Sequence, residues 1–438
     1  MPLRTMHLDP EMTVGQLQKT HSISSVGQLL PYGNIKHTGL PEGIEELEQT
    51  PVEFNAGKLD YADEQKIYTT QPMCFDEQGR LVGAPDSERT ECFISGYLKR
   101  KIASTPNIGA RIPRPSSTMY RISESLGKGL GMFATKDIPA GELILAERPL
   151  MIVPITATTT RDGDIPKHLT LHQMQQVLLQ DTEVVYKVLI DRLEPDRKKA
   201  FYELANSHLH NGSGPILGRI RTNGFGFNEM RDLAPGMCGG YSIVCDELSR
   251  LNHSCSPNTF HRWDMPSFTV QLRAARHIKK DEEITTTYID LTTIAANRQK
   301  QLAPYQIVCN CTSCANHSVS DPRRLACINW EKQNAGYVFG HFDPESKPAL
   351  GPLMAAYKTY VAEGLEATSG FGQVLEMLMG SCAKHGDVPN TKLFAKKFGV
   401  WKLSQNGSAG NSKELERLLM ALAKWMSIMK TQQKLKLR

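Results

Sequence analysis

Two short stretches hold the residue types that most readily do chemistry. The first, CNCTSC, places Cys309, Cys311 and Cys314 within six residues. Three thiolates this close supply three corners of a tetrahedral zinc site, and zinc requires a fourth ligand. Unliganded thiols in such a cluster would be prone to oxidation, which favours the metal. The sequence therefore predicts a zinc site here.

The fourth ligand does not follow from spacing alone. His317, just after the cluster, is a local candidate. The other candidates are the seven remaining cysteines: Cys74, Cys92, Cys238, Cys245, Cys255, Cys327 and Cys382. Isolated cysteines such as Cys74, Cys92 and Cys382 are more typically small buried hydrophobic residues.

The second stretch, RLNHSCSPNTF at 250–260, contains Asn252, His253, Ser254 and Cys255 side by side. A histidine so near a cysteine suggests a nucleophile pair, a metal site or a buried polar turn. The nucleophile pair is disfavoured, because catalytic Cys and His usually come together from distant parts of a sequence. A metal site and a polar turn remain open.

The strands that could position these residues are indicated by periodicity. Glycine-rich turns flank short apolar runs within 127–153, which predicts strands there. Apolar residues alternate with polar or small ones within 267–275, which predicts another strand. A further strand is expected within 282–289.

Helices are predicted between and after these strands. Residues 171–193 repeat apolar positions at helical spacing, Pro195 stops that helix, and 196–208 starts another. From about 321 the chain is again helical, and its last helix begins near Ser412 as N-cap. That helix carries an apolar stripe expected to face the core: Leu415, Leu418, Leu419, Leu422, Met426 and Met429. In contrast, residues 1–103 are poorly patterned, and 104–117, with three prolines, resemble a linker.

Composition restricts the class of protein. A chain of 438 residues with 40% hydrophobic and 22% charged residues is long enough for two or three folded domains. No run of 18 apolar residues exists and the first residues lack an apolar h-region, so neither a membrane span nor a secretory signal is expected. Ten cysteines without such a signal favour reduced thiols or metal ligands, in the nucleus or the cytoplasm.

Charge is distributed unevenly. Residues 392–438 contain eleven Lys/Arg and two Glu, a local charge of +9, so the rest of the +5 chain carries −4. This basic region is either a solvated helix or a surface for an acidic partner such as chromatin.

Four segments in order resemble the SET-domain protein lysine methyltransferases, and the set is far more specific than any one segment. The segments are GKGLGMFA (127–134), RLNHSCSPN (250–258), DEEITTTYID (281–290) and YQIVCNCTSC (305–314). The last segment most resembles the SET-and-MYND type, but residues 135–237 contain no cysteine, so the MYND zinc finger of that type is expected to be absent.

The resemblance implies an α+β fold: a β-rich SET core with a knot-like β-clip, a helical insert, a post-SET zinc loop and a helical C-terminal domain. The implied boundaries are an N-terminal extension and linker at 1–117, the SET domain at 118–292 with its insert at about 155–236, the post-SET segment at 293–320, and the C-terminal domain at 321–438.

The activity implied is methyl transfer from S-adenosylmethionine to the side-chain amine of a lysine in a protein, such as a histone. The alternative is a catalytically silent SET-fold adaptor that binds partners through its terminal regions. A nucleic-acid-binding zinc module would rest only on the cysteine cluster and the basic tail, which is weak support.

The resemblance also assigns residues. Tyr288 and Tyr305 are the implied catalytic pair, the first directing its hydroxyl at the methyl group and the second facing the ammonium with its ring. Glu282 and Glu283 would be structural rather than a general base. The implied cofactor-binding residues are Lys128, Gly129, Leu130, Gly131, Asn223, Ser249, Leu251, Asn252, His253 and Tyr288. For zinc, the resemblance supplies Cys255 as the ligand that joins Cys309, Cys311 and Cys314.

Two positions depart from the family pattern. Asp281 stands where relatives usually have glycine, which a turn should tolerate. Ile307 stands where relatives often have an aromatic residue that stacks on adenine, which should weaken cofactor binding.

Overall fold

The computed structural model describes residues 39–48, 57–75, 78, 81–82, 88–156, 161, 166–209, 212–233, 239–336 and 349–406. The helix expected near Ser412, its apolar stripe and most of the basic C-terminal region lie outside these residues. The chain divides into two compact units. The first combines residues 1–113, 147–249 and 263–270, and the second combines 114–146, 250–262 and 271–438.

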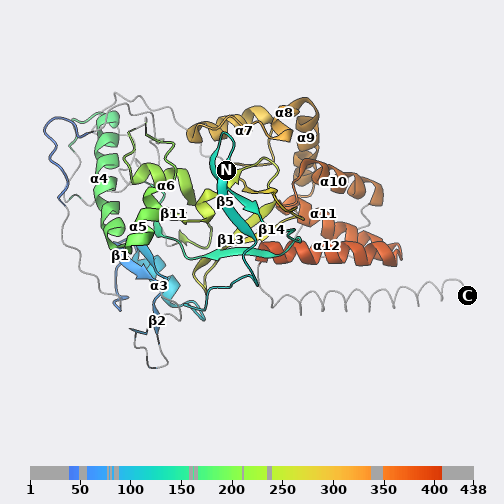
Figure 1. Cartoon of the computed structure of the whole chain (residues 1–438), viewed down its shortest axis with the longest axis horizontal. Helices are drawn as coiled ribbons and strands as arrows, with labels where there is room; N and C mark the ends of the chain where they lie inside the picture. Colours follow the sequence, from blue (N-terminus) through green and yellow to red (C-terminus); the bar gives the residue numbers. More distant parts are fainter. Residues whose placement is uncertain are drawn as a thin grey trace, which may run out of the picture. The chain divides into compact units, whose positions relative to one another are not determined.

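A six-stranded sheet forms the centre of the first unit (Figure 1). Its order is β1-β4-β8-β11-β10, with β9 paired to β11. The pair β4 and β8 is parallel and the other pairs are antiparallel. The strands are β1 (Lys66–Gln71), β4 (Thr90–Ser95), β8 (Met151–Pro154), β9 (Gly224–Phe225), β10 (Arg231–Asp232) and β11 (Gly239–Val244). A separate hairpin joins β2 (Cys74–Phe75) to β3 (Leu81–Val82).

The N-terminal region contributes to this sheet, although its sequence predicted no elements. All six residues of β4 are buried, and helix α3 (Gly96–Ala103) follows directly, capped by the Ser95 hydroxyl, which accepts from the Leu98 N–H at 3.0 Å. The apolar pattern is interrupted because Thr90 and Glu91 are polar yet buried. Strands β1 and β4 and helix α3 are therefore folded parts of the first unit, and the domain boundary expected at 117 stays a prediction.

Three further helices lie within the described residues of the first unit: α4 (Leu171–Arg192), α5 (Pro195–Tyr202) and α6 (Leu217–Asn223). A capping box starts α4, in which Thr170 and Gln173 exchange side-chain and backbone hydrogen bonds. Pro195 is the first residue of α5, a position where its missing N–H costs nothing. These helices and the sheet share one apolar core, which includes Phe93, Val153, Tyr186, Leu189, Phe201, Ile220 and Val244.

The second unit contains a four-stranded sheet in the order β12-β15-β6-β5. Its strands are β5 (Tyr120–Ser125), β6 (Gly129–Ala134), β12 (Asn252–His253) and β15 (Glu283–Thr286). Strands β12 and β15 run parallel, with Asn252 opposite Thr285. Because β15 ends at Thr286, Tyr288 lies just beyond the strand that was expected to include it.

Helices follow the second sheet to the end of the described chain. They are α7 (Ala295–Leu302), α8 (Thr312–Ala315), α9 (His317–Gln333), α10 (Leu350–Glu363), α11 (Ser369–Lys384) and α12 (Val388–Asn406). Neighbouring helices from α9 to α12 pack on one another (Figure 1), and α10 to α12 share a core that includes Leu353, Tyr360, Leu375, Leu378 and Phe398.

The remaining elements complete the predicted α+β class, which is confirmed. A third sheet has the order β13-β14-β7, formed by β13 (Thr259–Asp264), β14 (Thr269–Ala274) and β7 (Leu143–Glu147). Two short 3-10 helices are η2 (Leu248–Arg250) and η3 (Ala303–Tyr305). No helix within the described residues combines the length and apolar character needed to cross a membrane.

Candidate functional site

A cavity of about 430 Å³ lies in the second unit. It is lined by the turn before β6, by residues of the Asn252–Ser256 stretch and β15, and by the loop 306–311. This volume is within the usual range for a small-molecule site. Of the predicted cofactor residues, Lys128, Asn252 and His253 line the cavity.

Glu283 organises one wall of this cavity. Its carboxylate accepts hydrogen bonds from Lys128 Nζ at 2.9 Å, Asn252 Nδ2 at 2.8 Å and Ser125 Oγ at 2.9 Å. Burial alone would raise the pKa of Glu283, but these donors outweigh it and hold the pKa below its ordinary value. The carboxylate therefore stays ionised and fixes the Asn252 side chain, which also donates to the Leu130 carbonyl at 3.1 Å.

Gly129 and Gly131 are needed for different reasons. Gly129 has φ of +75°, a left-handed conformation that other residues adopt only with strain. At Gly131 a Cβ would lie 2.7 Å from Glu283 Oε1 and 2.8 Å from Asn252 Nδ2. The second glycine thus leaves room for the wall of polar side chains, a role that the sequence did not reveal.

Glu282 and Asp281 stabilise the turn before β15. Glu282 accepts from Asn258 Nδ2 at 3.1 Å and from the backbone N–H of Lys279 at 3.0 Å, and it pairs with Arg276 at 2.9 Å. These contacts agree with a structural carboxylate. Asp281 has φ of +64°, a left-handed conformation that glycine adopts without strain, and its carboxylate pairs with Arg121 at 2.9 Å.

The two tyrosines predicted to be catalytic lie together. Their ring centroids are 5.2 Å apart, with an interplanar angle of 47°. The hydroxyl of Tyr288 donates to the Leu251 carbonyl at 2.5 Å, which anchors the end of the side chain. Burial raises the pKa of Tyr288 above its ordinary value, so the phenol stays protonated. Tyr288 therefore cannot act as a phenolate base near neutral pH.

His253 links Tyr288 to the cysteines. Its Nδ1 accepts from the backbone N–H of Tyr288 at 3.2 Å, so the ring proton must sit on Nε2. Nε2 lies 3.3 Å from Cys255 Sγ and is therefore placed to donate to sulfur. Burial lowers the pKa of His253 to about 4, which keeps the ring neutral in this tautomer.

The four predicted metal ligands converge. The sulfurs of Cys255, Cys309, Cys311 and Cys314 all lie within 4.8 Å of one another. Cys255 Sγ is 3.8 Å from Cys309 Sγ and 3.5 Å from Cys314 Sγ. A tetrahedron with Zn–S bonds of about 2.3 Å has sulfur–sulfur edges of about 3.8 Å. The donor set and its spacing therefore fit zinc, and His317 is not part of the group.

Without a cation these thiols perturb one another. The contact with Cys309 raises the pKa of Cys255, whereas contacts with Cys255 and Cys309 lower the pKa of Cys311. A divalent metal removes this conflict, because it binds all four sulfurs as thiolates. The isolated Cys74, Cys92 and Cys382 are buried, as predicted, and Cys238 lies outside the described residues.

Asn223 and Ser249 belong to the first unit. Asn223 Nδ2 donates to the carbonyls of Ala205 and Arg219, both at 2.7 Å. Ser249 Oγ donates to the Asn223 carbonyl at 3.1 Å and accepts from the Cys245 N–H at the same distance. These bonds support the local backbone, and the predicted cofactor role of both residues stays a prediction.

Sequence reasoning missed several residues around the site. Gln299 donates to the Ile307 carbonyl at 2.6 Å and accepts from the Cys309 N–H at 3.2 Å, so it fixes the loop that lines the cavity. Ser125 supports Glu283, and Arg298 and Arg324 lie at the cysteine cluster. None belongs to a recognisable motif, so only the folded arrangement reveals them.

Several known proteins are similar to this chain in sequence. The SET domain model matches residues 129–289. The chain is 28% identical over 287 residues to histone-lysine N-methyltransferase set5 of Schizosaccharomyces pombe, covering 64% of this chain and 76% of that protein. It is 33% identical over 94 residues to N-lysine methyltransferase SMYD2-B of Danio rerio, covering 19% and 21%. A solved structure of Rubisco LSMT bound to AdoMet aligns at 12% identity and a TM-score of 0.28, covering 73% and 89%.

The similarity to a viral protein establishes the family to which the chain belongs. The putative SET domain-containing protein L678 of Acanthamoeba polyphaga mimivirus is 31% identical over 215 residues, which cover 44% of this chain and 77% of that protein. With the SET match spanning both the Gly129 turn and Tyr288, the chain belongs to the SET-domain family.

Proposed function

We propose that this chain is a protein-lysine N-methyltransferase that uses S-adenosylmethionine. The observation that carries the proposal is the cavity in the second unit, where Lys128, Asn252 and His253 converge on the loop before the cysteine cluster. The names of the fission yeast and zebrafish relatives support the reaction. A histone or a non-histone protein would supply the lysine.

The residues present fit the cofactor. The amide nitrogen of Asn252 donates hydrogen bonds to the Leu130 carbonyl and to the Glu283 carboxylate. Its side-chain carbonyl oxygen is therefore the atom suited to accept a hydrogen bond from the cofactor ammonium. Lys128 forms an ion pair with Glu283 and also lines the cavity. Its ammonium group is suited to bind the carboxylate of the cofactor. Backbone groups of Gly129, Leu130, Gly131, Leu251 and His253 would complete the binding, and Asn223 and Ser249 remain proposed contributors.

When bound, S-adenosylmethionine supplies a methyl group on a sulfonium, which an amine can take by in-line displacement. The protein's task is then to hold the amine in position and exclude water. Tyr288 commits its hydroxyl proton to the Leu251 carbonyl, so its oxygen lone pairs remain to face positive charge. The neighbouring ring of Tyr305 offers a π face to the ammonium.

The lysine must arrive as a neutral amine. Tyr288 has a raised pKa, and Glu282 and Glu283 have lowered pKa values and several donors each, so none of these three is suited to take the proton. Burial of the amine itself disfavours its charged form and lowers a pKa that is ordinarily about 10.4. We propose that the proton leaves to water before methyl transfer.

Zinc would have a structural role. Four protein thiolates close the coordination sphere and leave no position for substrate. Cys309 and Cys311 also line the cavity, and they belong to the same loop as Ile307 and Val308. A metal held there would fix the loop that forms one wall and would keep Tyr305 near Tyr288.

Transfer of radiolabelled methyl from S-adenosylmethionine to histones and to cell extracts tests the proposal. We expect labelling by the wild-type chain and a loss of about 100-fold in Tyr288→Phe, which removes the anchoring hydroxyl. Tyr357→Phe, on helix α10, is the matched control and should label normally. Equal labelling by wild type and Tyr288→Phe would refute the role of Tyr288.

Calorimetry with S-adenosylmethionine separates the enzyme from a silent adaptor. An enzyme should bind the cofactor with measurable heat, whereas a chain that shows neither heat nor labelling would be the adaptor.

Ile307 lines the cavity and offers no aromatic face, so Ile307→Phe should tighten cofactor binding if stacking on adenine is what this chain lacks. An acidic partner for exposed Lys392, Lys396 and Lys397 on α12 is a further proposal.

A further inference from the structure

Two arginines lie buried beside the four-cysteine cluster. Arg298 comes from α7 and Arg324 from α9, and neither exposes any measurable surface to solvent. Fully buried arginines are rare, because removing a guanidinium from water is costly unless it is well paired. Their partners therefore indicate what they do.

Arg298 contacts a predicted metal ligand directly. Its Nη2 lies 3.6 Å from Cys314 Sγ, within hydrogen-bonding distance for sulfur. Its Nη1 donates to the Thr293 carbonyl at 2.5 Å and lies 3.7 Å from the Asp321 carboxylate. A guanidinium donor favours a thiolate over a thiol, because hydrogen bonds to charged acceptors are stronger. Arg298 is thus positioned to support Cys314 as a ligand.

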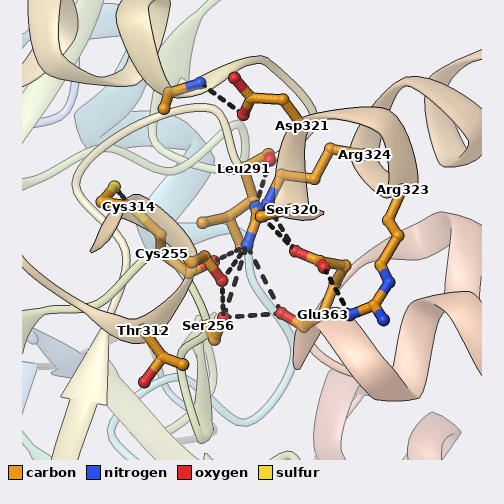
Figure 2. Close-up of polar contacts among 12 residues, drawn as sticks. Cys255, Ser256, Leu291, Thr312, Cys314, Ser320, Asp321, Arg323, Arg324 and Glu363 are labelled. Carbon is orange, nitrogen blue, oxygen red and sulfur yellow. Dashed lines mark hydrogen bonds and ion pairs between the residues drawn. The ribbon is translucent and has the colours of Figure 1, made fainter. Parts of the chain in front are cut away.

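Arg324 holds the backbone on which the ligands sit. Its Nη2 donates to the Cys255 carbonyl at 2.7 Å and to Ser313 Oγ at 3.2 Å, next to Cys314. Its Nη1 donates to the Leu291 carbonyl at 2.6 Å. Figure 2 shows the guanidinium of Arg324 directed at Cys255, Ser256 and Leu291. One side chain therefore ties the two halves of the cluster, which are more than fifty residues apart in sequence, to each other.

Glu363, at the end of α10, keeps Arg324 in place. Its carboxylate lies 3.2 Å from Arg324 Nε and accepts from Ser320 Oγ at 2.5 Å (Figure 2). The Glu363 carbonyl accepts from Ser256 Oγ at 2.6 Å. Through these bonds α9 and α10 reach the stretch that contains Cys255.

We propose that Arg298 and Arg324 form the outer shell of the four-cysteine metal site, so that helices α7, α9 and α10 belong to the metal centre. The inference rests on the zinc site of the proposed function. Groups that orient metal ligands typically contribute 10–100-fold to metal affinity. Arg298 acts on a ligand sulfur and Arg324 on the ligand backbone, so the two should leave different signatures.

Metal affinity is measured on the full-length, zinc-loaded chain by competition with a chelator. Arg298→Met and Arg324→Met should weaken zinc about 10–100-fold, whereas Arg298→Lys and Arg324→Lys, which keep the charge, should lose less. Arg323→Met is the matched control: Arg323 is adjacent in sequence, half-exposed, and 3.6 Å from the Glu363 carboxylate. Circular dichroism identifies any variant that fails to fold. Wild-type affinity in both methionine variants would overturn the proposal.

Cobalt substitution supplies a readout that a purely structural role would not change. The sulfur-to-cobalt charge-transfer band should shift in Arg298→Lys and Arg298→Met, which alter or remove the N–H···S contact with Cys314. It should stay unchanged in Arg324→Lys and Arg323→Met. An unshifted band in both Arg298 variants would refute the direct contact with sulfur.

Methyl transfer is assayed separately on the same preparations. Arginine-dependent zinc binding in a chain that transfers no methyl supports the outer shell and refutes only the proposed activity. A wild-type chain that binds no zinc refutes the metal site and the outer shell together, even if it transfers methyl groups.

Discussion

The apolar core of the first unit and the surroundings of the four cysteines in the second unit bury different kinds of side chain. The core of the first unit consists of aliphatic and aromatic residues packed between a sheet and three helices, such as Val153, Tyr186 and Leu189. Around the cysteines of the second unit the buried residues include the charged Arg298, Arg324 and Glu363. The first arrangement is stabilised mainly by removal of apolar surface from water. The second depends on hydrogen bonds and ion pairs that compensate for the burial of charged groups.

This difference predicts how each unit tolerates change. Truncation of a side chain in an apolar core lowers stability in proportion to the volume removed, but it leaves no buried polar group without a partner. A polar network is destabilised in a different way when one partner is removed, because the remaining polar groups stay buried without a hydrogen-bond partner. We therefore expect substitutions in the first unit to alter stability alone, and substitutions in the network to alter metal content.

The largest effect is expected for Cys255→Ser. Structural zinc sites contribute about 10–16 kcal/mol from four ligands, so loss of one thiolate should weaken zinc by about 100-fold or more. Metal content by atomic emission after dialysis against a chelator measures this, with Cys382→Ser as a buried cysteine outside the cluster. If Cys255→Ser kept all its zinc, the fourth ligand would lie elsewhere, and His317 would be the next candidate.

Leu189→Ala in the first unit provides the opposite case. Leu189 is fully buried in α4 within the apolar core, and such truncations cost about 2–5 kcal/mol of unfolding free energy. Thermal unfolding should show a lower midpoint, while the zinc content of the folded chain stays at the wild-type level. Loss of zinc at temperatures where the variant is folded would contradict the separation of the two kinds of core.

Much of the fold follows from local sequence. The helix over 171–193 and the strands within 127–153 are visible because their apolar residues recur at regular spacing. Strand β4 is missed, since buried Thr90 and Glu91 break its pattern. The end of β15 is misplaced because periodicity does not reveal that the chain leaves the sheet before Tyr288.

Only the site residues that belong to a sequence motif can be predicted from the sequence. The close spacing of Cys309, Cys311 and Cys314 indicates a metal site. The sequence alone does not identify Cys255 as the fourth ligand, which follows only from the family resemblance. Arg324 and Glu363 carry no signal at all, since arginine and glutamate in helices are usually exposed. Their burial arises from tertiary contacts with carbonyls such as that of Cys255, which no local pattern encodes.

Acid should destabilise the second unit through His261. Burial lowers the pKa of His261 to about 4, below the value of 6.5 expected in the unfolded chain. The unfolded state therefore binds more protons between these values, and the stabilising contribution is present above pH 6.5 and lost as the pH falls towards 4. Between pH 7 and pH 5 this loss amounts to about 2 kcal/mol.

Denaturant unfolding at several pH values measures the effect. His261→Asn retains an acceptor for Thr286, which lies 3.0 Å from Nδ1, but cannot titrate. Its unfolding free energy should depend less steeply on pH than that of the wild type between pH 5 and pH 7. Parallel pH profiles would mean that His261 has the same pKa in the folded and unfolded states, which would contradict the prediction.

The smallest effects should come from Gly129 and Gly131 of strand β6, and the physical cause differs between the two positions. Gly129→Ala forces a left-handed conformation on a residue with open space around it, at a cost of about 1–2 kcal/mol. Gly131→Ala costs a similar amount by overpacking against Glu283 and Asn252, but it must also displace them. Calorimetric titration with S-adenosylmethionine should therefore show weakened binding for Gly131→Ala beyond that for Gly129→Ala, at matched losses of thermal stability. Equal affinities would mean that Asn252 does not hold the cofactor, and that the polar wall serves the fold alone.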